Sequence, residues 1–213
     1  MKKFSVICLS MMLLACVSVM ADGEKTTNLV VGFTPGIGQS RLSIKHDAKN
    51  GAKDKFTYNQ EVAVNVGLER VLNGIIILPE LHYSRSKLNK DEIAPNSQFP
   101  YGELKNLSEV GFMQYFGFTL NAKKRFQVPL MAGVGIDYMF GEPVHNCFWA
   151  YGVKARMKFY ITPKVGIFAG GMFKGNYGTS NRGEDSGYHS DDAKFKLNKT
   201  NFNAEVGLTI TLH

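Results

Sequence analysis

Three side chains that could do chemistry stand at alternate positions of one short segment, IIILPELHYSRSKL: Glu80, His82 and Ser84. A histidine can take the proton of a serine hydroxyl and activate it as a nucleophile, and a carboxylate can orient the histidine. In an extended strand the three side chains share one face, but successive residues on that face are roughly 7 Å apart along the backbone. The apolar residues between them indicate that this face points inward, away from lipid. The pattern therefore predicts a structural role, with catalysis as the weaker alternative.

Other ionisable residues also stand at alternate positions in extended segments. Lys154, Arg156 and Lys158 alternate with apolar residues, and three cations on one face cannot face lipid, so they must face an interior or water. Pairing with acids would offset the cost of burying them. We expect Glu80, Lys154, Arg156 and Glu205 near mid-height, and we predict a plug of side chains; the alternative is a proton or ion path. The predicted interior charge network comprises Glu80, His82, Asp137, Lys154, Arg156 and Glu205, with Glu61, Glu69, Glu109 and Lys158 also pointing inward.

No other residue pattern indicates an active site. His189, Ser190 and Asp191 are consecutive, so their side chains do not converge on one point. Cys147 has no basic partner beside it in the sequence and is expected to be a passive thiol. The chain shows no metal-ligand spacing, no phosphate-binding loop and no nucleophile elbow. We therefore expect no enzyme activity, no cofactor, no metal and no nucleic-acid partner.

The first 21 residues have the pattern of a secretory signal peptide. Lys2 and Lys3 precede an almost wholly apolar run to Met20, and Val19-Met20-Ala21 fits a cleavage site. The alternative is lipidation at Cys16, after Leu13-Leu14-Ala15. Removal of residues 1–21 lowers the formal charge from +7 to +5 and leaves residues 22–213 as one domain, long enough for a full core.

The clearest structural signal is the stretch RFQVPLMAGVGIDYMF, residues 125–140. Its even positions are all apolar, whereas its odd positions are polar, small or flexible, and include Pro129 and Asp137. Such alternation is typical of a strand between two different media. Sixteen residues exceed the usual five or six of a strand but suit a tilted strand that crosses a bilayer, which needs about nine to eleven. Pro129 lacks an N–H, so we predict a bulge or an interrupted ladder there.

Seven further segments show related patterns, and the connections between them alternate between tight and long. Asn73-Gly74 and Thr162-Pro163-Lys164 mark tight turns. This pattern predicts an all-β fold, an eight-stranded closed antiparallel up-and-down transmembrane β-barrel with both termini in the periplasm. A soluble barrel or sandwich is the alternative, but its apolar exterior would need a cover. The predicted strands are 28–40, 56–70, 74–86, 107–120, 125–140, 147–160, 165–176 and 200–213, and two aromatic belts should flank the lipid-facing band.

The long connections are expected to carry whatever specificity the protein has. The first of them, residues 41–55, has five basic residues against Asp47 and Asp54. This excess predicts a solvated loop; the alternative is a surface that attracts lipopolysaccharide phosphates or another anionic partner. The last, residues 177–199, mixes both signs. The basic residues of the first loop are Arg41, Lys45, Lys49, Lys53 and Lys55.

Two stretches carry a resemblance to a known family. The segment Ile75 to Leu88 resembles the strand that reads roughly "lqPELlYs" in the small outer-membrane β-barrel family common in Bacteroidota. The run from Leu107 to Tyr138, with Pro129-Leu130 followed by Ala132-Gly133-Val134-Gly135, is similar to that family's next hairpin. The resemblance implies a closed barrel in the outer membrane and no single activity, because this fold serves many roles.

A second resemblance concerns the His82-x-Ser84 pair alone, which is similar to the pair used by outer-membrane lipid A deacylases. Arg85 follows the serine where that family has asparagine, and the pair lies far from the C-terminus. We therefore expect a non-enzymatic barrel with a structural or surface-interaction role. A narrow porin-like channel is the alternative, and a lipid A-modifying enzyme is less favoured. Expected partners are outer-membrane lipid and lipopolysaccharide, with an extracellular protein or glycan ligand bound through the long loops.

Overall fold

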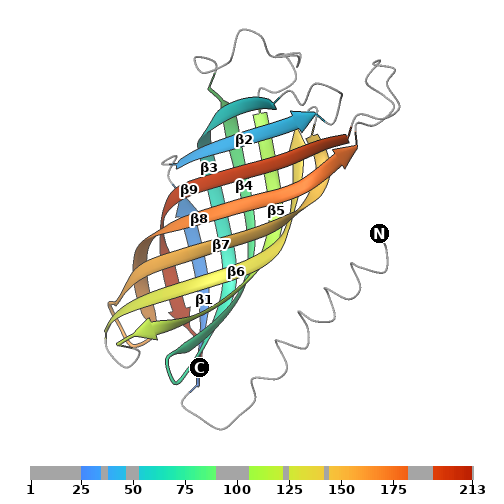
Figure 1. Ribbon diagram of the computed structural model, residues 1–213. Helices are drawn as coiled ribbons and strands as arrows, with labels where there is room; N and C mark the ends of the chain where they lie inside the picture. The colour runs from blue at the N-terminus through green and yellow to red at the C-terminus, as the bar shows by residue number, and fades with distance from the viewer. Residues whose placement is uncertain are drawn as a thin grey trace.

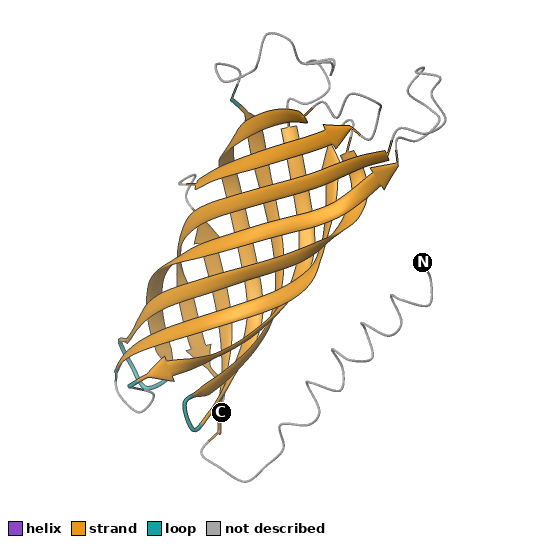
Figure 2. Ribbon diagram, viewed as in Figure 1, coloured by secondary structure: helices purple, strands orange, loops and turns teal. Residues whose placement is uncertain are grey.

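The computed structural model describes residues 25–34, 38–46, 53–89, 106–121, 125–141, 144–181 and 194–212. These residues form strands joined by turns (Figures 1 and 2). No helix in these ranges has the length and apolar character needed to span a membrane. The strands are β1 (Lys25–Thr34), β2 (Gly38–His46), β3 (Lys53–Leu72), β4 (Ile75–Leu88), β5 (Asn106–Leu120), β6 (Phe126–Gly141), β7 (Val144–Tyr160), β8 (Val165–Asn181) and β9 (Lys194–Thr211).

The sheet closes on itself as an eight-stranded barrel. From β3 to β9 each strand pairs antiparallel with the next along the chain, and β1 and β2 both pair with β3 on one side and β9 on the other. β1 and β2 therefore lie end to end and together occupy one of the eight strand positions of the barrel (Figure 1). This confirms the predicted closed antiparallel up-and-down barrel, and closure gives every strand two neighbours.

The strands run further toward the long connections than the sequence predicts. β8 and β9 stay paired up to Asn181 and Lys194, so the predicted loop 177–199 is shorter at both ends. Similarly, β2 and β3 pair from Gln39 and Asn59 to Lys45 and Lys53, inside the predicted loop 41–55. The predicted limits were wrong here because they followed the apolar alternation, whereas ladder hydrogen bonds form equally well where the outward side chains are polar.

The two faces of the wall differ as the alternation predicts. In β6, Phe126, Val134 and Tyr138 point outward and are 46%, 60% and 42% exposed, whereas Asp137 and Met139 are buried inside. Large apolar side chains point outward from the other strands in the same way. The two predicted aromatic sets are Phe116, Phe118, Phe126 and Phe159 toward the tight turns, and Tyr83, Tyr138, Phe140 and Trp149 toward the long connections. All of them are exposed on the outside except Phe140, which is partly buried and stacks on Tyr138.

Pro129 interrupts one ladder without shifting it. The pairing of β6 with β7 runs from Phe126 and Gln127 directly to Leu130, omitting Val128 and Pro129, and the register is the same on both sides of the gap. Of the two predicted outcomes, the interrupted ladder is therefore correct and the bulge is not. Pro79 has the same effect on the pairing of β4 with β3, which omits Leu78 and Pro79. Because proline lacks an N–H, it removes one ladder hydrogen bond, but the strand does not need the extra residue of a bulge to accommodate it.

The tight turns and both described chain ends lie at one end of the barrel. Asn73 and Gly74 have φ angles of 51° and 86°, and a two-residue hairpin turn of type I′ requires a positive φ at both of its central residues. Lys25 pairs with Leu72 next to this turn, and the backbone N–H of Leu212 donates to the carbonyl of Thr27. We call this the turn end and the opposite rim the loop end.

We expect an arginine at mid-height on the exterior to destabilise the barrel. Val134→Arg should lower the free energy of unfolding in lipid vesicles by about 2–4 kcal/mol, the cost of a cation at the bilayer midplane. The matched control is Ile161→Arg, in the turn between β7 and β8, where the expected cost is only about 0–1 kcal/mol. Equal costs at the two positions would show that the exterior does not face hydrocarbon.

Candidate functional site

The bore of the barrel is filled by charged side chains from seven strands, β3 to β9. Alternation along each strand directs them inward, and each is at most 2% exposed. They form three layers along the barrel axis, and hydrogen bonds join the members of each layer. The acids are Glu69, Glu80, Glu109, Asp137 and Glu205, and the bases are Lys154, Arg156, Lys158, Lys174 and Lys199.

The layer nearest the turn end is one ion pair with two polar neighbours. Lys158 Nζ on β7 donates to both carboxylate oxygens of Glu69 on β3, at 2.5 and 2.6 Å. Asn28 Nδ2 donates to Glu69 Oε1 at 3.0 Å, and Thr211 Oγ1 donates to Asn28 Oδ1 at 2.8 Å. The polar neighbours thus connect the ion pair to the junction between β1 and β9.

The middle layer joins two acids and two bases. Lys154 Nζ donates to both carboxylate oxygens of Glu80, at 2.6 and 2.9 Å. Arg156 connects the two acids: its Nε donates to Glu205 Oε1 at 2.6 Å and its Nη2 to Glu80 Oε2 at 3.1 Å. Asn65 Nδ2 lies within hydrogen-bonding distance of both acids. Glu80, Lys154, Arg156 and Glu205 are four residues of the predicted interior charge network, and the structure brings them together.

Aromatic rings cover the two cations of the middle layer. Lys154 Nζ lies 4.8 Å from the centre of the Tyr115 ring, and Arg156 Cζ lies 4.5 Å from that of Phe168. A cation over an aromatic face gains more where water is excluded. Tyr115 belongs to an apolar cluster inside the wall of β4 to β7, so the bore has an apolar side and a polar side. That cluster consists of Ile76, Leu78, Met113, Tyr115, Met131 and Ala150.

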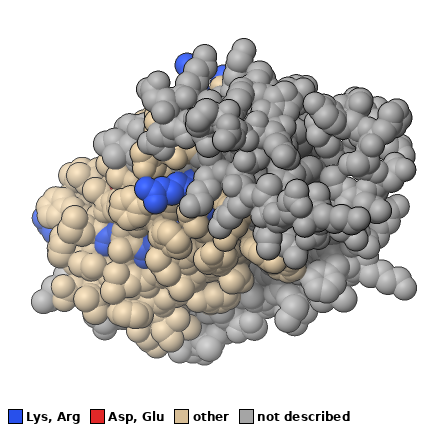
Figure 3. Space-filling view, turned by 45° about the horizontal axis from the view of Figure 1, so that its top comes forward, with Lys and Arg blue, Asp and Glu red and all other residues tan. Residues whose placement is uncertain are grey.

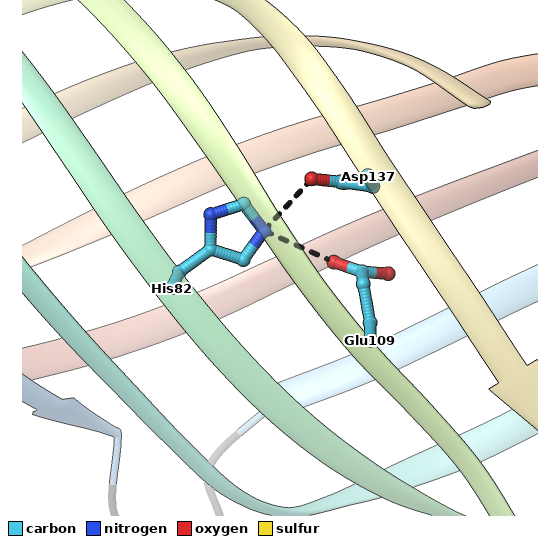
Figure 4. A group of neighbouring side chains, drawn as sticks. All are labelled: His82, Glu109 and Asp137. Atoms are coloured by element: carbon cyan, nitrogen blue, oxygen red, sulfur yellow. Dashed lines mark ion pairs between the residues drawn. The ribbon is translucent and has the colours of Figure 1, made fainter. Parts of the chain in front are cut away.

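The loop-end layer is built around Lys174 on β8. Its ammonium contacts Glu109, Asp137 Oδ2 at 2.9 Å and His82 Nε2 at 2.8 Å. His82 Nε2 is also 2.9 Å from Asp137 Oδ1 and 3.5 Å from Glu109 Oε1 (Figure 4). Lys199 Nζ on β9 donates to Glu109 Oε2 at 2.5 Å. The cluster therefore joins β5, β6, β8 and β9 through their charged side chains and β4 through His82.

Each layer has equal numbers of acids and bases. The turn-end layer has Glu69 and Lys158, the middle layer has two of each sign, and the loop-end layer has two of each sign besides His82. A buried charge is costly unless it is paired and hydrogen-bonded. Neutrality layer by layer lets ten charges share a narrow bore without a net field along the axis.

Two glycines provide the space that the network needs. A Cβ at Gly111 would lie 1.9 Å from Asp137 Oδ1 and 2.8 Å from His82 Cε1, and a Cβ at Gly32 would lie 2.0 Å from Asn65 Oδ1. Neither position accepts a side chain without displacing a network residue.

The structure brings together a set of metal-ligand types that the sequence spacing did not reveal. Ligand atoms of His82, Glu109 and Asp137 lie within 4.8 Å of one another, although they come from three strands. One histidine and two carboxylates are a donor set that suits zinc. The ammonium of Lys174, however, contacts all three groups. The cation that these ligands hold is the lysine, and a metal ion would have to displace it.

The Glu80, His82 and Ser84 set does not form a catalytic relay. Ser84 points inward and is 6% exposed, so lipid outside the wall cannot reach it. The Glu80 carboxylate bonds to Lys154 and Arg156 in the middle layer, while His82 Nε2 faces Asp137 and Lys174 in the loop-end layer. Glu80 and His82 therefore belong to different layers.

The predicted basic loop is largely strand. Arg41 and Lys45 lie on β2, Lys53 and Lys55 lie on β3, and Lys49 lies outside the described residues. Arg41 is exposed on the outer surface. Glu61 lies where the β3–β4 register shifts between Gln60 and Val62, and its side chain lies outside the described part of the chain.

Sequence reasoning missed several members of the network. Lys199 was assigned to the last loop, and Lys174 was not recognised as inward-facing within the glycine-rich run before that loop. Lys199 shares its parity with Asn201, Asn203 and Glu205, all buried on the inward face of β9. That parity was the available signal. Asn28, Asn65 and Asn176, whose Nδ2 donates to Asp137 Oδ2, were missed because asparagine carries no charge.

A small polar cavity separates the middle and loop-end layers. Its volume is ≈ 20 Å³, and its lining includes Glu80, His82, Lys174, Asn201 and Asn203. The buried Oδ1 atoms of both asparagines have no hydrogen-bond partner among the described residues. About 10–15 Å³ is enough for one water molecule, so the cavity suits a bound water.

Comparisons with known proteins bear on the fold. In sequence comparisons, no protein-family model and no curated protein matches this chain. Solved structures do resemble it. The outer membrane protein OprG from Pseudomonas aeruginosa is 10% identical, with 90% of this chain and 98% of that chain covered and a TM-score of 0.52. The outer membrane protein AlkL in DMPC lipid bilayers is 9% identical, with 92% of this chain and 94% of that chain covered and a TM-score of 0.51.

The outer membrane protease OmpT from Escherichia coli is a more distant likeness, at 11% identity and a TM-score of 0.48 over 88% of this chain and 97% of that chain. Its TM-score is too low for the likeness to bear on activity here. OprG and AlkL support the barrel fold and carry no information about ligands or chemistry.

We expect the middle layer to respond to charge imbalance more than to loss of contacts. Glu80→Gln leaves Lys154 and Arg156 with one acid between them and should destabilise the barrel by about 3–5 kcal/mol. The double variant Glu80→Gln with Lys154→Met restores neutrality and should be more stable than Glu80→Gln alone. Urea unfolding in lipid vesicles measures both, and additive losses would contradict the neutrality argument.

We also expect removal of the central lysine to turn the loop-end layer into a metal site. Lys174→Ala leaves His82, Glu109 and Asp137 around a vacant position, so added Zn²⁺ should raise the melting temperature of this variant and leave the wild-type protein unchanged. Lys199→Ala is the matched control, because it also deprives Glu109 of a cation but leaves Lys174 in place. Zinc stabilisation of Lys199→Ala or of the wild type would show that Lys174 does not hold the metal position.

Proposed function

We propose that this chain is an integral outer-membrane β-barrel that is not an enzyme and that has a structural or surface-interaction role. The observation that carries the proposal is the combination of an apolar exterior on a closed barrel with a bore filled by three neutral layers of charge. Charged and polar side chains fill the described part of the bore, so the surfaces that we propose for partners are the exterior and the loop-end rim.

The location in a membrane is supported by the exterior. Outward side chains from all around the wall are apolar and half exposed, such as Leu81 at 61% and Phe202 at 65%. An apolar surface of this extent belongs against another apolar surface, and a closed barrel leaves no unpaired strand edge in hydrocarbon. The outer membrane is supported by the fold shared with OprG and AlkL, which are both described as outer membrane proteins.

The orientation follows from the short turns. In outer-membrane barrels, the short turns face the periplasm and the longer connections face outward. Residues 1–21 would direct export as a signal peptide and be removed. The mature chain would then begin and end on the periplasmic side, and we propose membership of the small barrel family common in Bacteroidota on the motifs at Ile75 to Leu88 and at Pro129 to Gly135.

A structural plug fits the interior better than a conduit does. In the middle layer, Arg156 bonds to both Glu80 and Glu205. Lys154 Nζ bonds to Glu80 and also lies 3.5 Å from Glu205 Oε2. An ion that crossed this layer would have to separate paired charges. The specific observation that favours the second candidate, a narrow porin-like channel, is the polar cavity between the middle and loop-end layers.

Partners are therefore proposed on the outside of the barrel. Outer-membrane lipid and lipopolysaccharide would contact the wall, and an extracellular protein or glycan would bind through the long connections. No described residue pattern indicates nucleic acid as a partner.

Two measurements test this proposal together. Membrane fractionation of cells that express the full chain should place it in the outer membrane, and the purified barrel should show no reproducible open state in a planar bilayer, because the charge layers close the bore. Heat-dependent migration on a gel verifies that the barrel is folded in the bilayer sample. A steady conductance of the folded barrel would favour the channel, and recovery of the chain from another compartment would contradict the proposal as a whole.

A further inference from the structure

The signs of charge are divided between the inside and the outside of the barrel. Among the side chains that the structure describes, every acid is buried in the bore, and every exposed charge is basic. Ordinary protein surfaces intersperse both signs. In the space-filling view, Lys and Arg appear on the described surface and Asp and Glu do not (Figure 3). The exposed bases are Arg41, Arg70, Arg85, Lys87, Arg125 and Lys164.

These exposed bases lie at the two rims and avoid the middle of the wall. Arg70, Arg125 and Lys164 lie at the turn end, next to the hairpin turns. Arg41, Arg85 and Lys87 lie at the loop end, on β2 and β4. Cations are costly at the centre of a bilayer but not at its interfaces, so each trio stands at the height of a headgroup layer.

The loop-end trio forms part of one polar patch. Strand pairing places Gln39, Asn59, Lys87 and Asn106 in a single row across β2, β3, β4 and β5. Arg41 lies two residues from this row on its loop-end side and Arg85 two residues from it on its turn-end side, both on the outward face. Neighbouring strands are about 4.8 Å apart, so long cationic side chains and short amides from four strands can reach one headgroup.

An apolar and aromatic border lies directly below the patch. Tyr83 precedes Arg85 on the same face of β4 and is 39% exposed, and its strand partners Val64 and Val110 are 38% and 45% exposed. Aromatic rings of this kind lie at the level where acyl chains meet headgroups. A ligand that fits both parts has acyl chains below and phosphate groups above.

We infer that the loop-end patch of Gln39, Arg41, Asn59, Arg85, Lys87 and Asn106 binds the phosphate groups of lipid A, the lipid portion of lipopolysaccharide. Lipid A carries two phosphates on a disaccharide above several acyl chains, which suits a patch several strands wide. Arginine adds bidentate recognition of phosphate, and the amides supply donors to sugar and phosphate oxygens. The inference builds on the proposed outer-membrane function, since only there does the loop end meet lipopolysaccharide.

The test compares the two trios of cations in the full-length barrel. One variant carries Arg41→Gln, Arg85→Gln and Lys87→Gln; its matched control carries Arg70→Gln, Arg125→Gln and Lys164→Gln, with the same change of charge at the other rim. Purified lipid A is titrated into each protein in detergent and bound lipid is counted by native mass spectrometry. Dephosphorylated lipid A and phosphatidylglycerol are titrated in parallel.

The loop-end variant should bind lipid A on the order of 100-fold more weakly than the wild type, because each Lys or Arg near an anionic surface contributes about fivefold. The turn-end variant should bind it as the wild type does, and dephosphorylated lipid A should bind weakly to all three proteins. Equal losses in both variants, or no loss in either, would overturn the inference. So would phosphatidylglycerol binding that depends on the loop-end trio as strongly as lipid A binding does.

Failure of the inference can be distinguished from failure of the proposed function. Both variants must migrate as folded barrels and fractionate with the outer membrane. If the wild-type chain is absent from that membrane, the proposed function fails. If it is present and the two variants bind lipid A alike, only the lipid A site is wrong.

Discussion

Burial of charge in a closed bore is the constraint on which the structure depends. Ten charged side chains lie where water is nearly absent, and each is tolerable only beside an opposite charge with its hydrogen bonds made. The pairs join strands that are far apart around the wall: Glu69 on β3 to Lys158 on β7, and Glu109 on β5 to Lys199 on β9. The network therefore braces the barrel across its diameter, in addition to the ladders that run around it.

The same constraint shapes the residues without charge. Gly111 and Gly32 leave room for Asp137 and Asn65, and Tyr115 and Phe168 cover the cations of the middle layer. The acids are drawn inward to meet the bases of β7, β8 and β9. The described acids are all buried in the bore, where they pair with bases. The charged side chains that remain exposed at the rims, among the described residues, are therefore basic.

The sequence was sufficient for the wall and insufficient for the contacts across it. Alternation over residues 125–140 identified the outward face, Asn73-Gly74 identified a tight turn, and the missing N–H of Pro129 indicated an interrupted ladder; each follows from local geometry. Which acid meets which base depends on the stagger between strands, which no single strand encodes. Lys199 was missed because it lies before the predicted strand 200–213, where the outward residues of β9 are not consistently apolar. Lys174 was missed because Gly171 and Gly175 interrupt the apolar alternation near the end of the predicted strand 165–176. The triangle of His82, Glu109 and Asp137 likewise exists only once three strands are aligned.

The distance along the chain between network partners has a consequence for how the barrel is assembled. Glu205 bonds to Asn65, 140 residues away, and Thr211 bonds to Asn28, 183 residues away. Such contacts form late, after most of the chain is in place. A slip of one residue in any strand would turn its inward side chains to the outside and leave their partners in the bore unpaired. Closure in the wrong register is therefore unfavourable when β9 pairs with β1 and β2. The buried charges thus select the correct register at the last step of barrel closure.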